Sequence, residues 1–229
     1  MKLAIDGQGL ERIYGKGSQR VEALRGIDLQ VPAGKFVAIK GRSGSGKTTL
    51  LNCIGGLDRG NAGNIHIFNR DITQLNDAQL TDWRSKEVGF VFQSFGLLPT
   101  LSAFENVELL LRIADVPYQR RQEQARYCLG LVGLEKWADH RPYEMSGGQQ
   151  QRVAIARAIA NQPQVILADE ATGELDSETA VEILSLFREL VDKESLTILL
   201  ATHDSLVDEF VHEIRFLKDG TIGLEPTTP

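Results

Sequence analysis

A glycine-rich run near the start of the chain has the residue types and spacing of a phosphate-binding loop. The run reads Gly41-Arg42-Ser43-Gly44-Ser45-Gly46-Lys47-Thr48. It fits the pattern Gly-x4-Gly-Lys-[Ser/Thr], in which glycines let the backbone approach phosphate oxygens. We expect Lys47 to reach the β- and γ-phosphates of a nucleotide and the Thr48 hydroxyl to bind Mg²⁺. Thr49 is expected to belong to the same site.

The residues on either side of this run distinguish a phosphate loop from a Gly/Ser linker with a chance lysine. The apolar segment Phe36–Lys40 precedes it, and a helix-forming segment over residues 48–54 follows and stops at Gly55-Gly56. This order predicts a strand, a loop and a helix whose positive N-terminal end faces the anion.

A second candidate lies at the end of another apolar segment, Val165–Asp169, which is followed by Glu170. Burying carboxylates is costly unless they have partners, and a metal ion and a water molecule are such partners. We expect Asp169 to hold Mg²⁺ through water and Glu170 to act as general base on a water in line with the γ-phosphate. A solvated strand end is the alternative.

A third motif reads Met145-Ser146-Gly147-Gly148-Gln149, and a helical pattern follows it. Ser146 and Gln149 have the spacing of a capping box, so a plain helix cap is one interpretation. It leaves the two adjacent glycines unexplained, because glycine weakens a first helical turn.

With this motif the sequence resembles the ABC ATPase family, whose signature is Leu-Ser-Gly-Gly-Gln. The resemblance implies an ATPase that hydrolyses ATP with Mg²⁺ as a head-to-tail homodimer. In such a dimer, Ser146, Gly147, Gly148 and Gln149 of one subunit would face the ATP held by the phosphate loop of the other, with Ser146 and Gly148 on the γ-phosphate.

The same resemblance assigns roles to four further residues. Tyr14 would stack on adenine, Gln93 would touch Mg²⁺ and the water, and Asp176 would lie in the dimer-contact loop. His203 would contact the γ-phosphate and orient Glu170. Taken singly, Tyr14 could equally be a surface residue and His203 a structural histidine.

Three positions depart from the family pattern. Met145 replaces the usual Leu and conserves volume. Ala171 stands where the family usually has Pro and is expected to loosen a turn, while Glu174 adds a negative charge near the dimer seam. We expect effects on dimer affinity and hydrolysis rate, not on ATP binding.

The elements that must position these residues follow the pattern of an α/β fold with a largely parallel sheet. The strand candidates are Phe36–Lys40, Val88–Phe92, Val165–Asp169 and Thr197–Thr202. The pieces Val21–Leu24 and Ile27–Val31 are interpreted as antiparallel strands with a turn at Gly15–Ser18.

The middle of the chain has helical spacing instead, around Glu105–Ala114 and Arg120–Val132. With the resemblance, this predicts a P-loop NTPase (RecA-like) core with an N-terminal antiparallel β subdomain and an inserted α-helical subdomain. The whole chain, 1–229, would be a single ABC ATPase domain, with the core at 1–93 plus 161–229 and the helical subdomain at 94–160.

Composition narrows the class of protein. The chain has 229 residues and a formal net charge of −6, which argues against nucleic acid as the main partner. Cys53 and Cys128 are too few for a disulfide framework and are expected to be reduced and buried. We see no signal peptide and no transmembrane segment, so a role at a membrane needs a partner protein.

The segment after Gln93 suggests that partner, because Phe95, Leu97, Leu98 and Pro99 are apolar in a stretch expected to be exposed. Packing within the helical segment is the alternative. The resemblance implies an integral membrane permease at this surface and a location on the cytoplasmic face of the inner membrane.

Within the family, the chain looks like a bacterial subfamily of lipoprotein-releasing, macrolide-export and cell-division ATPases (LolD-, MacB- and FtsE-like). This leaves two functions open: powering a permease, or acting as an ATP-gated mechanical switch without transport.

Overall fold

The central feature of the fold is a six-stranded sheet. The structure is a computed structural model that describes residues 2–223. Across the sheet the strands are β10 (Thr221–Gly223), β9 (Glu213–Lys218), β3 (Phe36–Lys40), β8 (Thr197–Thr202), β7 (Val165–Asp169) and β6 (Val88–Val91). All neighbours pair in parallel except β10 with β9, so the predicted parallel sheet is confirmed.

The central strands β3, β8 and β7 are buried on both faces, as their uninterrupted apolar sequences predict. In β7, Val165 and Leu167 point into one hydrophobic core, while Ile166 and Ala168 point into the other. The alternation follows from the period of two along a strand. Strands β3, β7 and β8 have the predicted limits, and β6 ends one residue early, at Val91.

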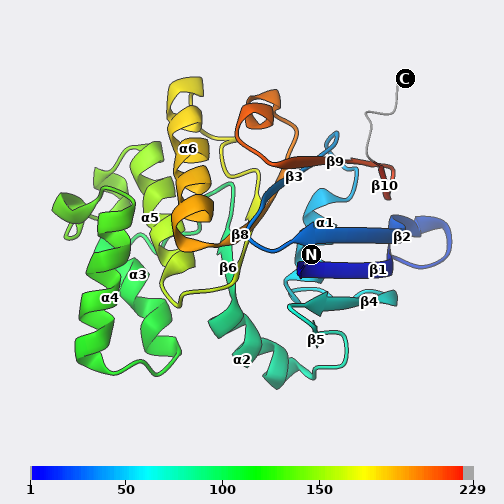
Figure 1. Cartoon of the computed structure of the whole chain (residues 1–229), viewed down its shortest axis with the longest axis horizontal. Helices are drawn as coiled ribbons and strands as arrows, with labels where there is room; N and C mark the ends of the chain where they lie inside the picture. The colour runs from blue at the N-terminus through cyan, green and yellow to red at the C-terminus, as the bar shows by residue number, and fades with distance from the viewer. Residues whose placement is uncertain (1, 224–229) are drawn as a thin grey trace.

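Within residues 2–223, six α-helices complete the layers. They are α1 (Lys47–Ile54), α2 (Asp77–Glu87), α3 (Ala103–Ile113), α4 (Tyr118–Leu131), α5 (Gly147–Ile159) and α6 (Ser177–Glu194). Figure 1 shows α3, α4, α5 and α6 on one side of the six-stranded sheet and α1 on the other. Within the described residues, no helix is both long and apolar enough to cross a membrane.

The helix starts follow from capping residues. The side chains of Ser102 and Ser146 accept hydrogen bonds from the backbone N–H groups of Glu105 and Gln149, three residues on, in complete capping boxes. The two predicted helices in the middle of the chain are confirmed, each beginning two residues earlier than expected. In the part of the chain that the structure describes, four short 3-10 turns join the elements: Gly17–Gln19, Glu135–Trp137, Pro142–Glu144 and Ser205–Glu209.

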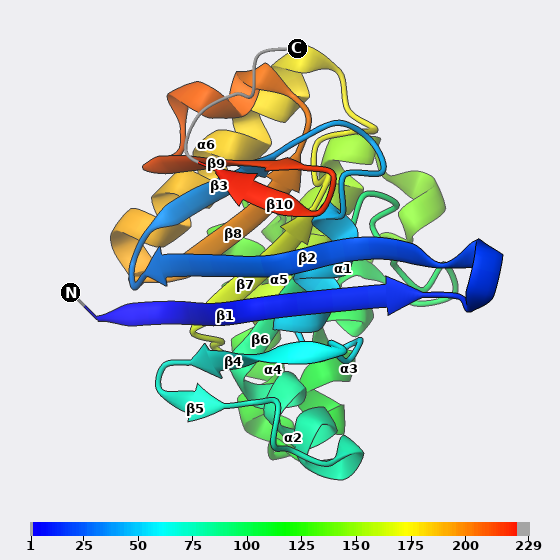
Figure 2. The ribbon, with the colours of Figure 1, turned by 90° about the vertical axis from the view of Figure 1, so that its right-hand side faces the viewer.

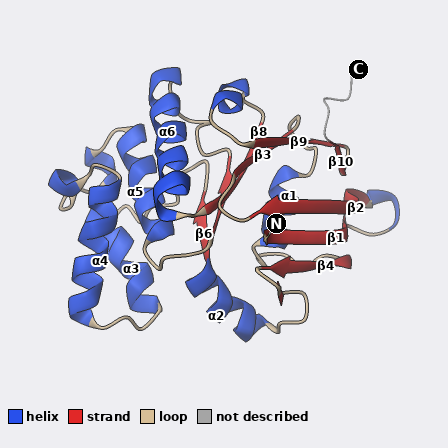
Figure 3. Ribbon diagram, viewed as in Figure 1, coloured by secondary structure: helices blue, strands red, loops and turns tan. Residues whose placement is uncertain are grey.

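A second, antiparallel sheet packs against the far side of α1, as Figures 2 and 3 show. Its order is β2 (Val21–Pro32), β1 (Leu3–Tyr14), β4 (Ala62–Ile67) and β5 (Arg70–Asp71). The predicted antiparallel subdomain is therefore present, and the connection from β1 to β2 passes through the predicted turn region.

The assignment of its strands was wrong in one respect. Val21–Leu24 and Ile27–Val31 are parts of one strand, β2, whose antiparallel partner is β1. Gly26 adopts a φ of 69°, a left-handed conformation that glycine tolerates, so the strand continues through an irregularity that breaks its apolar alternation.

We predict that Phe187→Ala lowers the free energy of unfolding by about 3–5 kcal/mol, because the side chain is fully buried under β3. Its ring meets that of Phe36 edge to face at 5.9 Å. Urea denaturation measures the change. Val181→Ala on the same helix, where Val181 is exposed, should stay within about 0.5 kcal/mol of wild type. Equal losses in the two variants would contradict the packing described.

Candidate active site

The predicted site residues follow strands that run in the same direction, so they meet at one edge of the sheet. Gly41 follows β3, Glu170 follows β7, His203 follows β8 and Gln93 lies two residues after β6. Because β3, β8, β7 and β6 are neighbours in that order, their carboxyl ends form one continuous row. Ligands of open α/β sheets bind outside such a row.

The phosphate loop packs tightly between β3 and α1. A Cβ on Gly41 would lie 2.3 Å from the carbonyl oxygen of Leu217, so only glycine fits there. Gly46, just before α1, has a φ of 107° and would place a Cβ 2.5 Å from the carbonyl oxygen of Ala23. These close approaches give the glycines of the motif a physical requirement.

Lys47 is buried at the first turn of α1, with 6% of its surface exposed. Its Nζ donates hydrogen bonds to the carbonyl oxygens of Gly41 (2.9 Å) and Arg42 (3.3 Å), and it lies 3.4 Å from Oε1 of Glu170. The loop therefore wraps around its own lysine, which presents a positive charge next to the carboxylate.

Glu170 is the centre of the polar network at this edge. Nδ1 of His203 lies 3.0 Å from both of its carboxylate oxygens, and the Thr202 hydroxyl donates to Oε2 at 3.2 Å. Its backbone has a φ of 47°, an uncommon left-handed conformation of the kind often found at functional sites. The N–H of Gly173 donates to the Glu170 carbonyl at 2.9 Å and closes the turn.

Asp169 lies deeper, where burial raises the pKa of its carboxyl, although a hydrogen bond from Thr48 acts in the opposite direction. Its Oδ1 is buried and has no hydrogen-bond partner. A buried carboxylate oxygen without a partner, beside a hydroxyl, fits a divalent cation. No group of three or more His, Cys, Asp or Glu among residues 2–223 could hold a metal, so any ion here would need other ligands.

An open cleft of about 920 Å³ collects the predicted residues at the surface. Those that line it are Tyr14, Ser43, Gly44, Gly46, Lys47, Thr48, Thr49, Gln93, Glu170 and His203. Gly41, Arg42 and Ser45 line a hollow on the other side of the loop. The Gln93 amide lies over Gly173, where an added Cβ would be 3.3 Å from Nε2.

Sequence reasoning missed six residues of the cleft wall. They are Val21, Glu22, Ala23, Arg25, Asp219 and Gly220. They come from the start of β2 and the turn between β9 and β10, which are joined by a hydrogen bond from Arg25 N–H to the Gly220 carbonyl. Of these six residues, Asp219 and Gly220 alone have a recognisable sequence pattern, that of a two-residue hairpin turn.

Tyr14 lines the cleft at the end of β1 and is held in place by two neighbours. Its hydroxyl donates to Oδ2 of Asp58 at 2.7 Å, and the guanidinium of Arg12 lies over its ring at 4.4 Å from the centroid. The ring is therefore fixed at the cleft, a location suited to stacking on a flat base.

The signature motif does not reach this cleft within one chain. Ser146 caps α5, and a Cβ on Gly148 would lie 2.4 Å from Cγ2 of Thr179 on α6. Asp176 caps α6, and its carboxylate accepts from the N–H (3.0 Å) and hydroxyl (2.7 Å) of Thr179. These residues thus form a second cluster, at the paired N-termini of two helices.

Two of the three departures from the family pattern, Ala171 and Glu174, lie in sequence between Glu170 of the cleft and Asp176 of the second cluster. Ala171 is buried, and its carbonyl accepts a hydrogen bond at 2.6 Å from the amide of the fully buried Gln151. Glu174 is exposed. The turn has this anchor from α5 in addition to its own backbone hydrogen bonds, while the extra charge of Glu174 faces outward.

Comparisons with known proteins agree with this geometry. A family model described as ABC transporter matches residues 24–173. An uncharacterized ABC transporter ATP-binding protein of Thermotoga maritima is 47% identical over 227 residues, covering 98% of this chain and 96% of the relative. The lipoprotein-releasing system ATP-binding protein LolD of Saccharophagus degradans is 43% identical over 210 residues, covering 92% of each chain.

A solved structure supports the same relationship. It is the ATP-binding cassette MJ0796 of Methanocaldococcus jannaschii in a dimeric, post-hydrolysis state bound to ADP and Pi. The TM-score is 0.87 at 42% identity, over 95% of this chain and 96% of that one.

We predict that Lys47→Ala abolishes nucleotide binding, because it removes the buried charge that the phosphate loop encloses. Equilibrium binding of a fluorescent ATP analogue measures the effect. Lys86→Ala is the matched control, because Lys86 is exposed on α2 and pairs with Asp82, four residues away on the same helix. Wild-type affinity in Lys47→Ala would refute the assignment of the loop.

Proposed function

Because the chain belongs to the ABC transporter ATP-binding family and is an ATP-hydrolysing subunit of that type, we propose that it powers a membrane permease through ATP-driven closure of a homodimer. The observation that carries the proposal is the separation of the two clusters. The cleft holds the phosphate loop, Glu170 and His203, but none of the signature residues Ser146–Gln149 lines it. A second copy of the chain would bring its own signature to that opening.

The residues of the cleft divide the chemistry between them. Lys47 and the phosphate loop would hold the β- and γ-phosphates, and Glu170 would take a proton from the attacking water. His203 is placed to orient that carboxylate, and Gln93 to position the water. Bidentate contact of His203 with Glu170 supports this assignment.

Mg²⁺ is the cation that these residues would hold, with the Thr48 hydroxyl as a direct ligand, Asp169 acting through a water molecule and Gln93 touching the ion. When bound, the ion would neutralise charge on the phosphates. The unpartnered Oδ1 of Asp169 supports the site, and the phosphates of ATP would supply ligands that the chain lacks.

Glu170→Gln should bind ATP with near wild-type affinity but hydrolyse it at least about a hundredfold more slowly, because an amide cannot accept the proton. With the nucleotide retained, we expect a dimer with ATP on gel filtration and a monomer without it. His203→Ala should also slow hydrolysis. A Glu170→Gln protein that stays monomeric with ATP and Mg²⁺ would contradict ATP-driven homodimerisation of the isolated subunit.

The permease contact is proposed for an apolar groove of about 410 Å³ beside the segment that follows Gln93. Leu57, Phe92, Leu98 and Ile113 line it, and all four are exposed apolar residues. Exposed apolar groups gathered in one groove favour a protein partner, such as a short helix of the permease.

The four residues that the sequence suggested for this contact differ in how far they are exposed. Leu98 lines the groove and is 45% exposed, and Pro99 is also exposed. Leu97 instead packs against the core, and the Phe95 side chain is half-buried, so both are less accessible than Leu98 and Pro99. We therefore propose that Leu98 and Pro99 make most of this contact, and that the chain lies on the cytoplasmic face of the membrane through its permease. A lipoprotein-release or macrolide-efflux system is the type we propose.

Leu98→Asp should reduce recovery of the membrane partner by at least about tenfold, since a charge in an apolar contact is costly. Its backbone is held independently by the buried Asn106 side chain, so folding and ATP affinity should stay unchanged. Affinity purification from solubilised membranes measures recovery. Tyr118→Asp, at an exposed position outside the groove, serves as the control. Equal recovery with both variants would contradict this contact.

A further inference from the structure

We propose that Asp58 is a positioning residue for nucleotide binding, which holds Tyr14 in the orientation that accepts adenine. The proposal rests on the proposed function of the cleft, and in particular on stacking of the base on Tyr14. Asp58 lies four residues beyond the end of α1, the helix that follows the phosphate loop. It is 44 residues away from Tyr14 in sequence.

The carboxylate of Asp58 is fully engaged with β1 and with its own loop. Oδ2 accepts from the Tyr14 hydroxyl (2.7 Å) and from Nε of Arg12 (2.9 Å). Oδ1 pairs with Nη2 of Arg12 (2.8 Å) and accepts from the backbone N–H of Arg59 (2.8 Å). These contacts hold the pKa of Asp58 below its usual range, despite partial burial.

This arrangement fixes the ring in two ways. The hydroxyl is anchored at one end, and the guanidinium of Arg12, itself oriented by Asp58, covers the ring at 4.4 Å. Because a bidentate Arg–carboxylate pair has a defined geometry, one carboxylate sets both partners. A ring fixed before the ligand arrives loses less side-chain entropy on binding.

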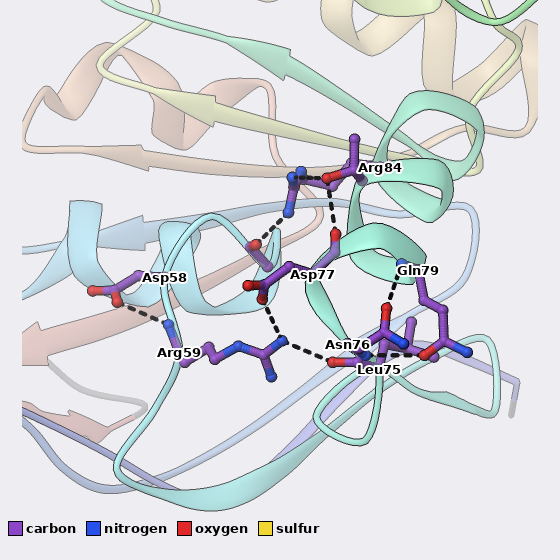
Figure 4. Close-up of polar contacts among 9 residues, drawn as sticks. Asp58, Arg59, Leu75, Asn76, Asp77, Gln79 and Arg84 are labelled. Atoms are coloured by element: carbon purple, nitrogen blue, oxygen red, sulfur yellow. Dashed lines mark hydrogen bonds and ion pairs between the residues drawn. The ribbon is translucent and has the colours of Figure 1, made fainter.

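The loop that carries Asp58 is also tied down on its other side. Figure 4 shows the side chain of Arg59 extending away from Asp58, to Asp77 (2.7 Å) and the carbonyl of Leu75 (2.8 Å). Arg84 of α2 donates to the carbonyl of Gly56. The loop that carries Asp58 is therefore held by contacts on both sides. Asp77 also pairs with an arginine but does not touch Tyr14.

The test separates the base-dependent part of binding from phosphate binding. ADP and inorganic pyrophosphate are each titrated, with Mg²⁺, in competition with a fluorescent ADP analogue. We expect Tyr14→Ala to weaken ADP binding by about tenfold, and Asp58→Ala and Tyr14→Phe each by about threefold. Pyrophosphate affinity should not change in any of them. The double variant Asp58→Ala/Tyr14→Phe should lose no more than Asp58→Ala alone, because Asp58→Ala already removes the hydrogen bond that Tyr14→Phe removes. Asp192→Ala, which removes an exposed carboxylate paired with Arg188 on α6, should match wild type.

Each other outcome overturns the inference in a recognisable way. Equal weakening of ADP and pyrophosphate in Asp58→Ala would mean that Asp58 supports the phosphate loop instead. Multiplicative losses in the double variant, or an unchanged ADP-to-pyrophosphate ratio in Asp58→Ala, would show that Asp58 does not position Tyr14. An unchanged ratio in Tyr14→Ala would refute stacking itself, and so the proposed role of Tyr14.

Discussion

The parallel pairing of β3, β8, β7 and β6 is the constraint on which the site depends. Parallel strands need crossover helices, and those helices bury both faces of the sheet. What remains accessible is the row of carboxyl ends, where Lys47, Asp169, Glu170 and His203 are brought together from positions up to 156 residues apart. Carboxylates at the ends of such apolar strands are tolerable because a lysine, a histidine and a hydroxyl lie within reach.

Sequence reasoning was most successful where one segment carries the whole physical signal. Strands buried on both faces, such as Val165–Asp169, are continuous apolar runs, and the capping box at Ser146 is local. It failed in the antiparallel sheet, where Gly26 and register shifts interrupt the alternation of β2. The contact between Tyr14 and Asp58 has no local signature, because it exists only after β1 and the loop behind α1 have come together.

Loops around the site are held by side chains that bind backbone carbonyls. Asn106, 1% exposed, donates to the carbonyls of Leu98, Leu101 and Ser102. Gln151 does the same for Ala171, next to Glu170. Hydrogen bonds of this kind fix irregular backbone that has no regular pairing, and so help turns near the site to keep a defined shape.

Arg157 is a third side chain that binds backbone carbonyls, and its contacts join two distant segments of the chain. It lies on α5, the helix that begins at the signature motif, and its guanidinium donates to the carbonyls of Phe95 and Gly96. Burial lowers the pKa of its guanidinium, so its charge depends on those carbonyls for compensation. Two hydrogen bonds thereby join α5 to the segment that precedes Leu98. Gly96 and Arg157 both line the apolar groove, so a displacement of α5 would carry that wall of the groove with it.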